Sequence, residues 1–122
     1  MKNIEVCSAI IMKDKKIFVT QRGYGDFKDK WEFPGGKIEK GETLQECIIR
    51  EIKEELDADI KVISLLNTIE YTYPAFHLIM HNFICELKDN HLTLLEHEAA
   101  KFIDLNDLND NVPTVFLLVT LI

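Results

Sequence analysis

One stretch of the sequence, residues 36–58, constrains this chain more than any other; it reads GKIEKGETLQECIIREIKEELDA. Residues 44–56 have the apolar periodicity of a helix. Thr43 is the expected N-cap, and Glu46, three residues later, completes a capping box. Asp57 follows where a helix often ends with a glycine in the left-handed conformation, which aspartate tolerates better than most side chains. The stretch therefore predicts a glycine turn that leads into one well-capped helix.

Two acidic residues of this helix lie on its apolar face, which normally points to the protein interior. At about 100° per residue, Glu51 and Glu55 fall within the apolar arc and Glu54 lies at its edge. Carboxylates at positions i, i+3 and i+4 can share hard cations such as Mg²⁺ or Mn²⁺. The alternative is a solvated helix face on which Arg50 pairs with Glu54. The inward direction of two acids favours the metal site.

Composition restricts the class of protein. A chain of 122 residues is long enough for one domain with a core and too short for two of ordinary size. Its 21 acidic and 14 basic residues give a net charge of −7, which disfavours binding to long nucleic acid. No apolar run has the roughly 20 residues of a membrane helix, and no secretory signal is evident. We therefore expect a cytoplasmic protein whose three cysteines are core residues.

The remaining sequence predicts strands on both sides of the helix. Alternating or β-branched segments, bounded by turn residues, indicate each of them. The expected strands are residues 4–12, 17–22, 31–33, 59–72, 76–87, 91–95 and 99–103. The first two form a hairpin, and 59–72 pairs with 76–87. A last helix begins at Val112 and Pro113. This order predicts a mixed β-sheet with flanking helices, an α/β fold.

The central stretch also resembles a known signature. Gly36, Glu42 and the segment Arg50-Glu51-Ile52-Lys53-Glu54-Glu55-Leu56 match the Nudix box, with Asp57 in place of its glycine. The resemblance extends over nearly the whole chain, through Trp-Glu-Phe-Pro-Gly-Gly-Lys upstream and Glu-His-Glu downstream. The chain is most similar to the MutT-like nucleoside triphosphate pyrophosphohydrolases of the Nudix hydrolase family.

This resemblance implies a fold and a reaction. The fold is an α/β/α sandwich, formed by a single Nudix hydrolase domain over residues 1–122. In MutT-like members water attacks the β-phosphorus of a nucleoside triphosphate, with Mg²⁺ as cofactor, and releases monophosphate and pyrophosphate. The implied role is sanitation of the nucleotide pool, a DNA repair function of the kind performed by 8-oxo-dGTP diphosphatases. Whether such a protein is a monomer or a homodimer is left open.

Carried over by position, the resemblance assigns roles to residues of this chain. The metal ligands are Glu51, Glu54, Glu55 and the Gly35 carbonyl, and Arg50 orients the carboxylates. Lys37 and Arg22 contact phosphate oxygens, a role that also suits a guanidinium at the end of a strand. The general base is either Glu54 or Glu96, which matches a late metal-binding or base position; Glu98 is the register alternative.

The nucleobase is less constrained. Phe33 and Tyr73 line a base pocket or belong to the core. Asn111 matches the asparagine that recognises oxidised guanine in MutT, or is a helix N-cap. Phe76 stands where MutT carries an arginine.

The sequence leaves several alternative functions open. The Glu-His-Glu segment at residues 96–98 resembles hydrolases of CTP and 5-methyl-dCTP, so this pyrimidine alternative stays beside the favoured 8-oxo-dGTP. Pro74 is a weak marker for ADP-ribose or dinucleoside polyphosphates. A non-catalytic nucleotide-binding Nudix module is the alternative of another class.

Overall fold

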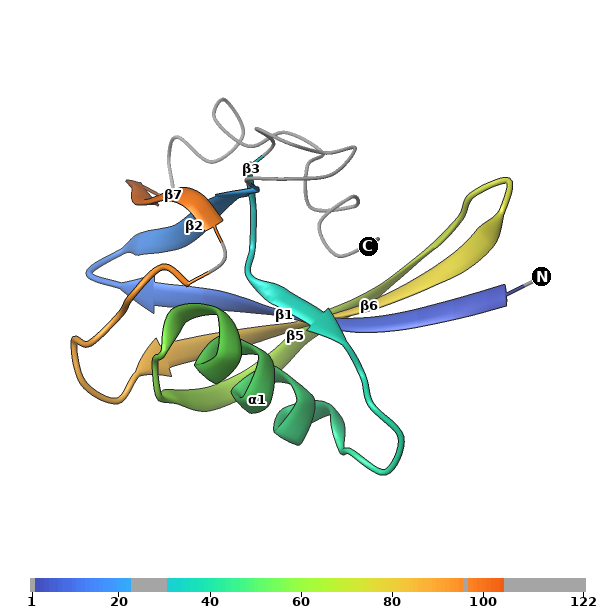
Figure 1. Cartoon of the computed structure of the whole chain (residues 1–122), viewed down its shortest axis with the longest axis horizontal. Coiled ribbons are helices and arrows are strands. Elements are labelled where there is room, and N and C mark those ends of the chain that lie inside the picture. The colour runs from blue at the N-terminus through green and yellow to red at the C-terminus, as the bar shows by residue number, and fades with distance from the viewer. Residues whose placement is uncertain (1, 23–30, 96, 105–122) are drawn as a thin grey trace.

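The computed structural model describes residues 2–22, 31–95 and 97–104 and shows strands around one central strand (Figure 1). Its elements in chain order are β1 (Lys2–Lys13), β2 (Lys16–Arg22), β3 (Trp31–Glu32), β4 (Gly35–Lys37), α1 (Leu44–Leu56), β5 (Ile60–Thr72), β6 (Phe76–Leu87) and β7 (His97–Asp104). The predicted last helix at Val112 lies outside the described residues.

The strands form a mixed seven-stranded sheet. The strand order is β3-β2-β1-β6-β5, while β4 pairs with β1 and β7 pairs with β2. β1 and β6 run parallel, and the other pairs are antiparallel. β1 is long enough to join β2 at its far end while its middle pairs with both β4 and β6. The short β4, which leads toward α1, is therefore anchored at the centre of the sheet.

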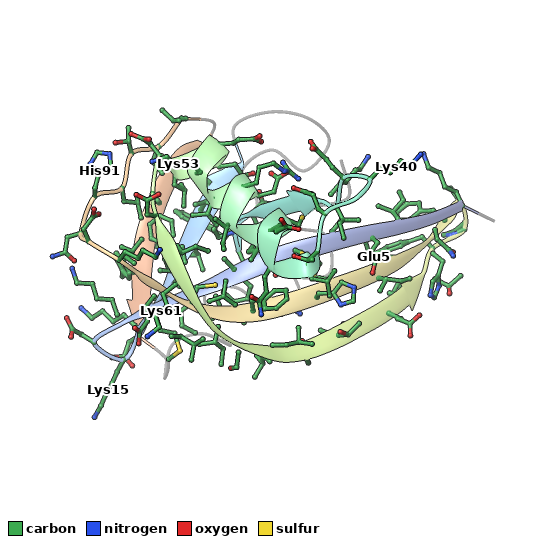
Figure 2. The ribbon with its side chains drawn as sticks, turned by 90° about the horizontal axis from the view of Figure 1, so that it is seen from below. Glu5, Lys15, Lys40, Lys53, Lys61 and His91 are labelled. Carbon is green, nitrogen blue, oxygen red and sulfur yellow. The ribbon has the colours of Figure 1, made fainter. Side chains whose placement is uncertain are left out.

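The two faces of β1 differ because successive side chains of a strand point to opposite sides. Cys7, Ala9 and Ile11 share a core cluster with the α1 residues Ile48 and Ile52. Figure 2 shows α1 lying across this face of β1, β6 and β5. The alternate residues of β1, such as Val6, face the other side, which we call the open-side face. Val6 belongs to a separate buried cluster there.

The ends of α1 match the sequence prediction. The Glu46 amide donates to Thr43 Oγ1 at 3.1 Å, and the Thr43 amide donates to Glu46 Oε1 at 2.8 Å. Asp57 adopts φ 50° and ψ 39°, and its amide donates to the Lys53 carbonyl at 3.0 Å. The capping box and the left-handed C-cap are confirmed, so both ends of α1 are defined locally.

Most strand predictions are confirmed, one is wrong, and one strand was not predicted. The hairpin of β1 and β2 and the antiparallel pair of β5 and β6 are present. Residues 91–95 are not a strand, because the amides of Thr93 and Leu95 donate to the carbonyls of Leu56 and Glu55 at the end of α1. The predicted strand 31–33 ends at Glu32, and the glycines expected only to turn the chain form β4.

The three cysteines are buried and free, as predicted. Within the described ranges, no helix has the length and apolar character needed to cross a membrane.

Candidate active site

The glycines of β4 let the backbone approach α1 and β1 closely. The Gly35 amide donates to Glu55 Oε2 at 3.1 Å. A Cβ on Gly35 would overlap the Cys7 carbonyl oxygen and lie 2.7 Å from Ser8 Cα. A Cβ on Gly36 would instead overlap the carboxylate of Glu51. Two carboxylates of α1 therefore lie against a surface that only glycine provides.

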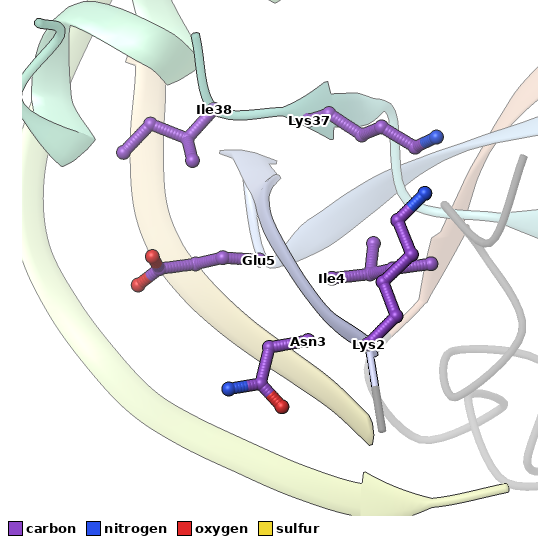
Figure 3. A pocket seen from close by; sticks show the side chains of 6 residues that line it. All are labelled: Lys2, Asn3, Ile4, Glu5, Lys37 and Ile38. Carbon is purple, nitrogen blue, oxygen red and sulfur yellow. The ribbon is translucent and has the colours of Figure 1, made fainter. Parts of the chain in front are cut away.

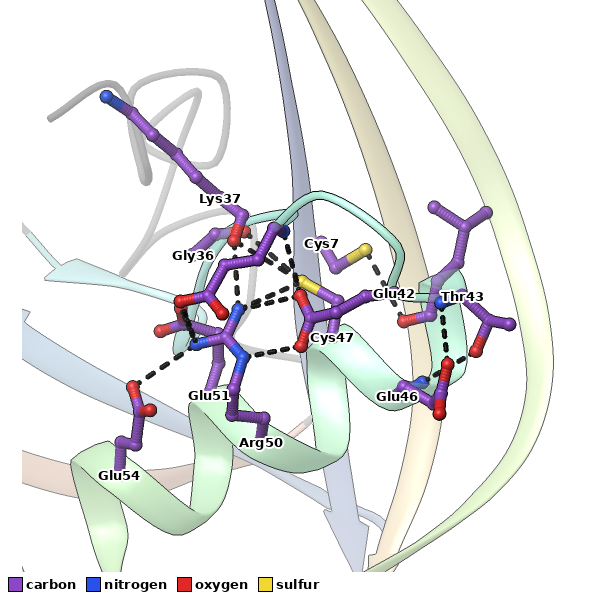
Figure 4. Close-up of polar contacts among 12 residues, drawn as sticks. Cys7, Gly36, Lys37, Glu42, Thr43, Glu46, Cys47, Arg50, Glu51 and Glu54 are labelled. Carbon is purple, nitrogen blue, oxygen red and sulfur yellow. Dashed lines mark hydrogen bonds and ion pairs between the residues drawn. The ribbon is translucent and has the colours of Figure 1, made fainter.

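Arg50 holds the acidic residues around it in fixed positions (Figure 4). Its Nε donates to Glu42 Oε2 at 2.5 Å, and its Nη2 donates to Glu42 Oε1 at 2.9 Å. Its Nη1 donates to Glu51 at 2.8 Å and to Glu54 at 3.2 Å. Nη2 also donates to the Lys37 carbonyl at 3.1 Å. Arg50 thus connects β4 and the turn before the helix to two of the acids on α1.

These contacts change the titration of both partners. The hydrogen bond from Arg50 lowers the pKa of Glu42 to about 2. The hydrogen bond to Glu42, followed by that to Glu51, raises the pKa of Arg50. Glu42 belongs to the box pattern of the sequence, which gives it no role. The structure assigns it the position of a bidentate partner that holds the Arg50 guanidinium.

The Glu42–Arg50 pair predicts a pH dependence of stability. A carboxyl whose pKa is lower in the folded protein stabilises the fold above its unfolded pKa, here 4.5, and loses that contribution toward its folded value, about 2. We expect the stability difference between the wild type and Glu42→Gln to be largest near neutral pH. It should shrink as the pH falls from 4.5 to about 2. Thermal unfolding across this range measures it, and a difference that is constant with pH would contradict the assignment.

The three predicted metal-binding glutamates differ in exposure. Glu55 is buried, the Glu51 side chain is 15% exposed and the Glu54 side chain is 56% exposed. In the described ranges no group of three acidic, histidine or cysteine side chains is arranged to hold a metal ion, since Arg50 binds two of these carboxylates and Gly35 the third. Their chemistry nevertheless fits a hard cation, because all three supply carboxylate oxygens beside a glycine backbone.

Lys37 extends from β4 toward the open-side face. It pairs with Val6, and Figure 3 shows its side chain pointing to the same side as Lys2 and away from Glu5. The two lysines line a pocket of about 260 Å³ that Ile4 and the acidic Glu5 also border. In a chain of net charge −7, two ammonium groups on one side provide a local place for an anion.

The predicted base-pocket residues are separated by the fold. Tyr73 and Phe76 are stacked with ring centroids 4.9 Å apart, and both pack on the buried cluster of Val6, Leu78 and Met80. This cluster is on the open-side face, as is Lys37. Phe33 is 5% exposed and belongs instead to the core cluster near β2. Its position fits the core interpretation that the sequence left open.

Four residues named in the sequence prediction lie wholly or in their side chains outside the described part of the chain. Glu96 and Asn111 lie outside the described residues, and so does the Glu98 side chain. Arg22 ends β2 as predicted, but its side chain also lies outside the described part of the chain.

Comparisons with known proteins show what the chain is similar to. The family model described as NUDIX domain matches residues 1–116. The 8-oxo-dGTP diphosphatase of Escherichia coli (strain K12) is 32% identical over 93% of this chain and 90% of its own length. The CTP pyrophosphohydrolase of the same organism is 37% identical over 80% of this chain and 72% of its own length.

The fold is also similar to that of solved Nudix structures. The crystal structure of a MutT NUDIX hydrolase from Burkholderia pseudomallei superposes with a TM-score of 0.84 at 23% identity. The match covers 97% of this chain and 95% of that one, which confirms the α/β sandwich. The chain therefore belongs to the NUDIX domain family and is a hydrolase that acts on phosphoric anhydrides.

Proposed function

We propose that this protein is a Mg²⁺-dependent pyrophosphohydrolase that converts nucleoside triphosphates to monophosphate and pyrophosphate. Its biological role would be to remove damaged nucleotides such as 8-oxo-dGTP from the pool, a DNA repair function in the cytoplasm. The proposal treats residues 1–122 as a single catalytic domain. The printed name of the 32% identical Escherichia coli relative supports the preference for 8-oxo-dGTP.

One observation carries the proposal: the contact of the Gly35–Gly36 backbone with the carboxylates of Glu51 and Glu55, beside the Arg50 network. This contact brings carboxylate oxygens from α1 against the glycine backbone of β4. Hard divalent cations prefer such oxygen ligands. Glu51, Glu54, Glu55 and the Gly35 carbonyl would hold Mg²⁺, with Mn²⁺ as a substitute and Glu96 as a further ligand.

A bound cation would neutralise the triphosphate and lower the pKa of the attacking water. The protein's own groups would complete the site. Arg50 orients Glu51 and Glu54 through the hydrogen bonds already present. Lys37 and Arg22 hold phosphate oxygens. Glu54, the most exposed of the three helix carboxylates, takes the proton of water as general base, and Glu96 is the alternative.

The nucleobase would lie on the open-side face, over the buried cluster of Val6 and Met80 that Tyr73 and Phe76 border. A stacked aromatic pair beside an apolar floor provides a surface for a base. Asn111 would contact the base edge, whereas Phe33 belongs to the separate core cluster near β2.

A second candidate is hydrolysis of CTP or 5-methyl-dCTP, favoured by the 37% identity with a CTP pyrophosphohydrolase. A non-catalytic nucleotide-binding module is disfavoured, because the chain keeps Arg50 and all the glutamates around it.

A panel of triphosphates tests the function. Purified protein is given 8-oxo-dGTP, dGTP, CTP, 5-methyl-dCTP and ADP-ribose with Mg²⁺, and monophosphate and pyrophosphate are quantified. We expect equimolar monophosphate and pyrophosphate, the highest kcat/KM for 8-oxo-dGTP, and no turnover after chelation of divalent metal. Nucleotide binding without any turnover would support the non-catalytic module, and the highest kcat/KM for a cytidine nucleotide would support the second candidate.

A further inference from the structure

A row of three polar side chains crosses the sheet next to the candidate site. Ser8 on β1 is in register with Asn82 on β6, which is in register with Asn67 on β5. On its other side Ser8 is in register with Gly35 of β4. The row therefore begins beside the glycine turn of the box and ends at the outer strand.

The hydrogen bonds along this row have a direction. Ser8 Oγ donates to Asn82 Oδ1, and Asn82 Nδ2 donates to Asn67 Oδ1 at 2.8 Å. Ser8 is fully buried and Asn82 is 5% exposed, while Asn67 is exposed. The carbonyl oxygen of the Asn67 side chain accepts this hydrogen bond, which leaves both donors of its amide nitrogen to contact another molecule. Among the described residues, this nitrogen has no hydrogen-bond partner.

The outer end of the row borders the surface assigned to the nucleobase. Ser8 lies two residues from Val6 on β1, and Asn82 lies two residues from Met80 on β6, so all four side chains share the open-side face. On β5 and β6, the next pair on the same face as Asn67 with Asn82 is Ile69 with Met80. Residues two apart on a strand are roughly 7 Å apart, about the width of a base. The amide of Asn67 thus lies one step from Met80, at the near end of the buried cluster of Val6, Leu78 and Met80. Tyr73 and Phe76 pack at the far end of the same cluster, three steps or roughly 20 Å from Asn67, so a base lying over Met80 is the one within its reach.

We propose that Asn67 is a specificity-determining residue that donates a hydrogen bond to a keto oxygen of the nucleobase, with Ser8 and Asn82 as positioning residues. This inference rests on the proposed function and narrows its substrate class. A base with a keto group, such as guanine or its 8-oxo form, offers an acceptor to Asn67. A base with an amino group at the same position offers a second donor, and both donors are then left unsatisfied.

Two matched pairs of substrates isolate this contact. dITP and dATP differ at C6 of the purine, and dUTP and dCTP differ at C4 of the pyrimidine, by a keto or an amino group. We expect the wild type to prefer the keto member of each pair by roughly 10-fold or more in kcat/KM. Asn67→Asp replaces the outward donor by an acceptor and still accepts from Asn82, so the fold is kept. This variant should lower both ratios by roughly 10-fold or more.

The control and the positioning residues complete the design. Asn90 is the control residue, because its exposed side-chain amide oxygen accepts from Lys13 Nζ, at 3.1 Å and at the far end of the sheet. Asn90→Asp should therefore leave both ratios unchanged. Ser8→Ala removes the hydroxyl that orients Asn82 and should reduce the keto preference without reversing it.

A binding measurement separates the inference from the proposed function. The Kd values of non-hydrolysable α,β-methylene analogues of the same nucleotides are measured in parallel. If hydrolysis fails while the Kd ratios change in Asn67→Asp, the proposed function is wrong and the role of Asn67 stands. Ratios that are the same in the wild type and Asn67→Asp would overturn the inference, as would a wild-type preference for the amino bases.

Discussion

Replacing Glu54 with glutamine is expected to lower turnover by about 10²- to 10⁴-fold while the unfolding temperature stays nearly constant. The Glu54 side chain is 56% exposed, and its ion pair with Arg50 at 3.2 Å is one of several that Arg50 makes. An exposed pair of this kind contributes about 1 kcal/mol or less to stability. The loss of the carboxylate would instead remove a proposed metal ligand and general base. Steady-state kinetics and thermal unfolding measure the two effects.

Glu86→Gln is the matched control, because Glu86 is an exposed glutamate on β6 away from α1. It should leave both turnover and stability unchanged. A Glu54→Gln variant with near wild-type turnover would show that Glu54 is neither the base nor a required ligand, and would transfer the assignment of the base to Glu96.

The two glycines of β4 are expected to respond differently to the same added methyl group. Gly35→Ala should destabilise the protein by about 1–3 kcal/mol or more, because the new Cβ meets the backbone of Cys7 and Ser8, which cannot move away. Gly36→Ala should be much less destabilising, because its Cβ meets the end of the flexible Glu51 side chain. The displaced carboxylate should instead lower kcat/KM by about 10²-fold.

Denaturant unfolding and kinetics of the two variants distinguish these effects, and each variant serves as the control for the other. Equal loss of stability in both variants would contradict the different contacts described for Gly35 and Gly36. Full activity of a folded Gly36→Ala variant would contradict the placement of Glu51 in the reaction centre.

Much of the helix and sheet was predictable, because their signals are local. The capping box at Thr43 and Glu46 specifies where α1 begins, and the left-handed Asp57 specifies where it ends. β-branched alternation located β5 and β6 to within one residue. The strand β4 was missed because glycine has a low strand propensity. Only its pairing with residues 6–8 of β1 makes residues 35–37 a strand.

The sequence predicted which way the glutamates of the candidate site face, but not which residues they contact. Periodicity alone placed Glu51 and Glu55 toward the interior, and the structure agrees. The hydrogen-bonded ion pair of Glu42 and Arg50 depends on how the turn before the helix folds back onto α1. The periodicity of apolar residues in a helix carries no information on that turn. The row of Ser8, Asn82 and Asn67 joins residues 74 and 15 positions apart, so it emerges only from strand register.

Hydrolysis in ¹⁸O-labelled water tests most directly the claim that the Glu51, Glu54 and Glu55 site directs water to the β-phosphorus. The substrate is 8-oxo-dGTP with Mg²⁺, and both products are analysed by mass spectrometry. The account predicts one ¹⁸O atom in pyrophosphate, unlabelled monophosphate, and no reaction in the presence of a chelator. Label in the monophosphate, or release of orthophosphate and a nucleoside diphosphate, would contradict it.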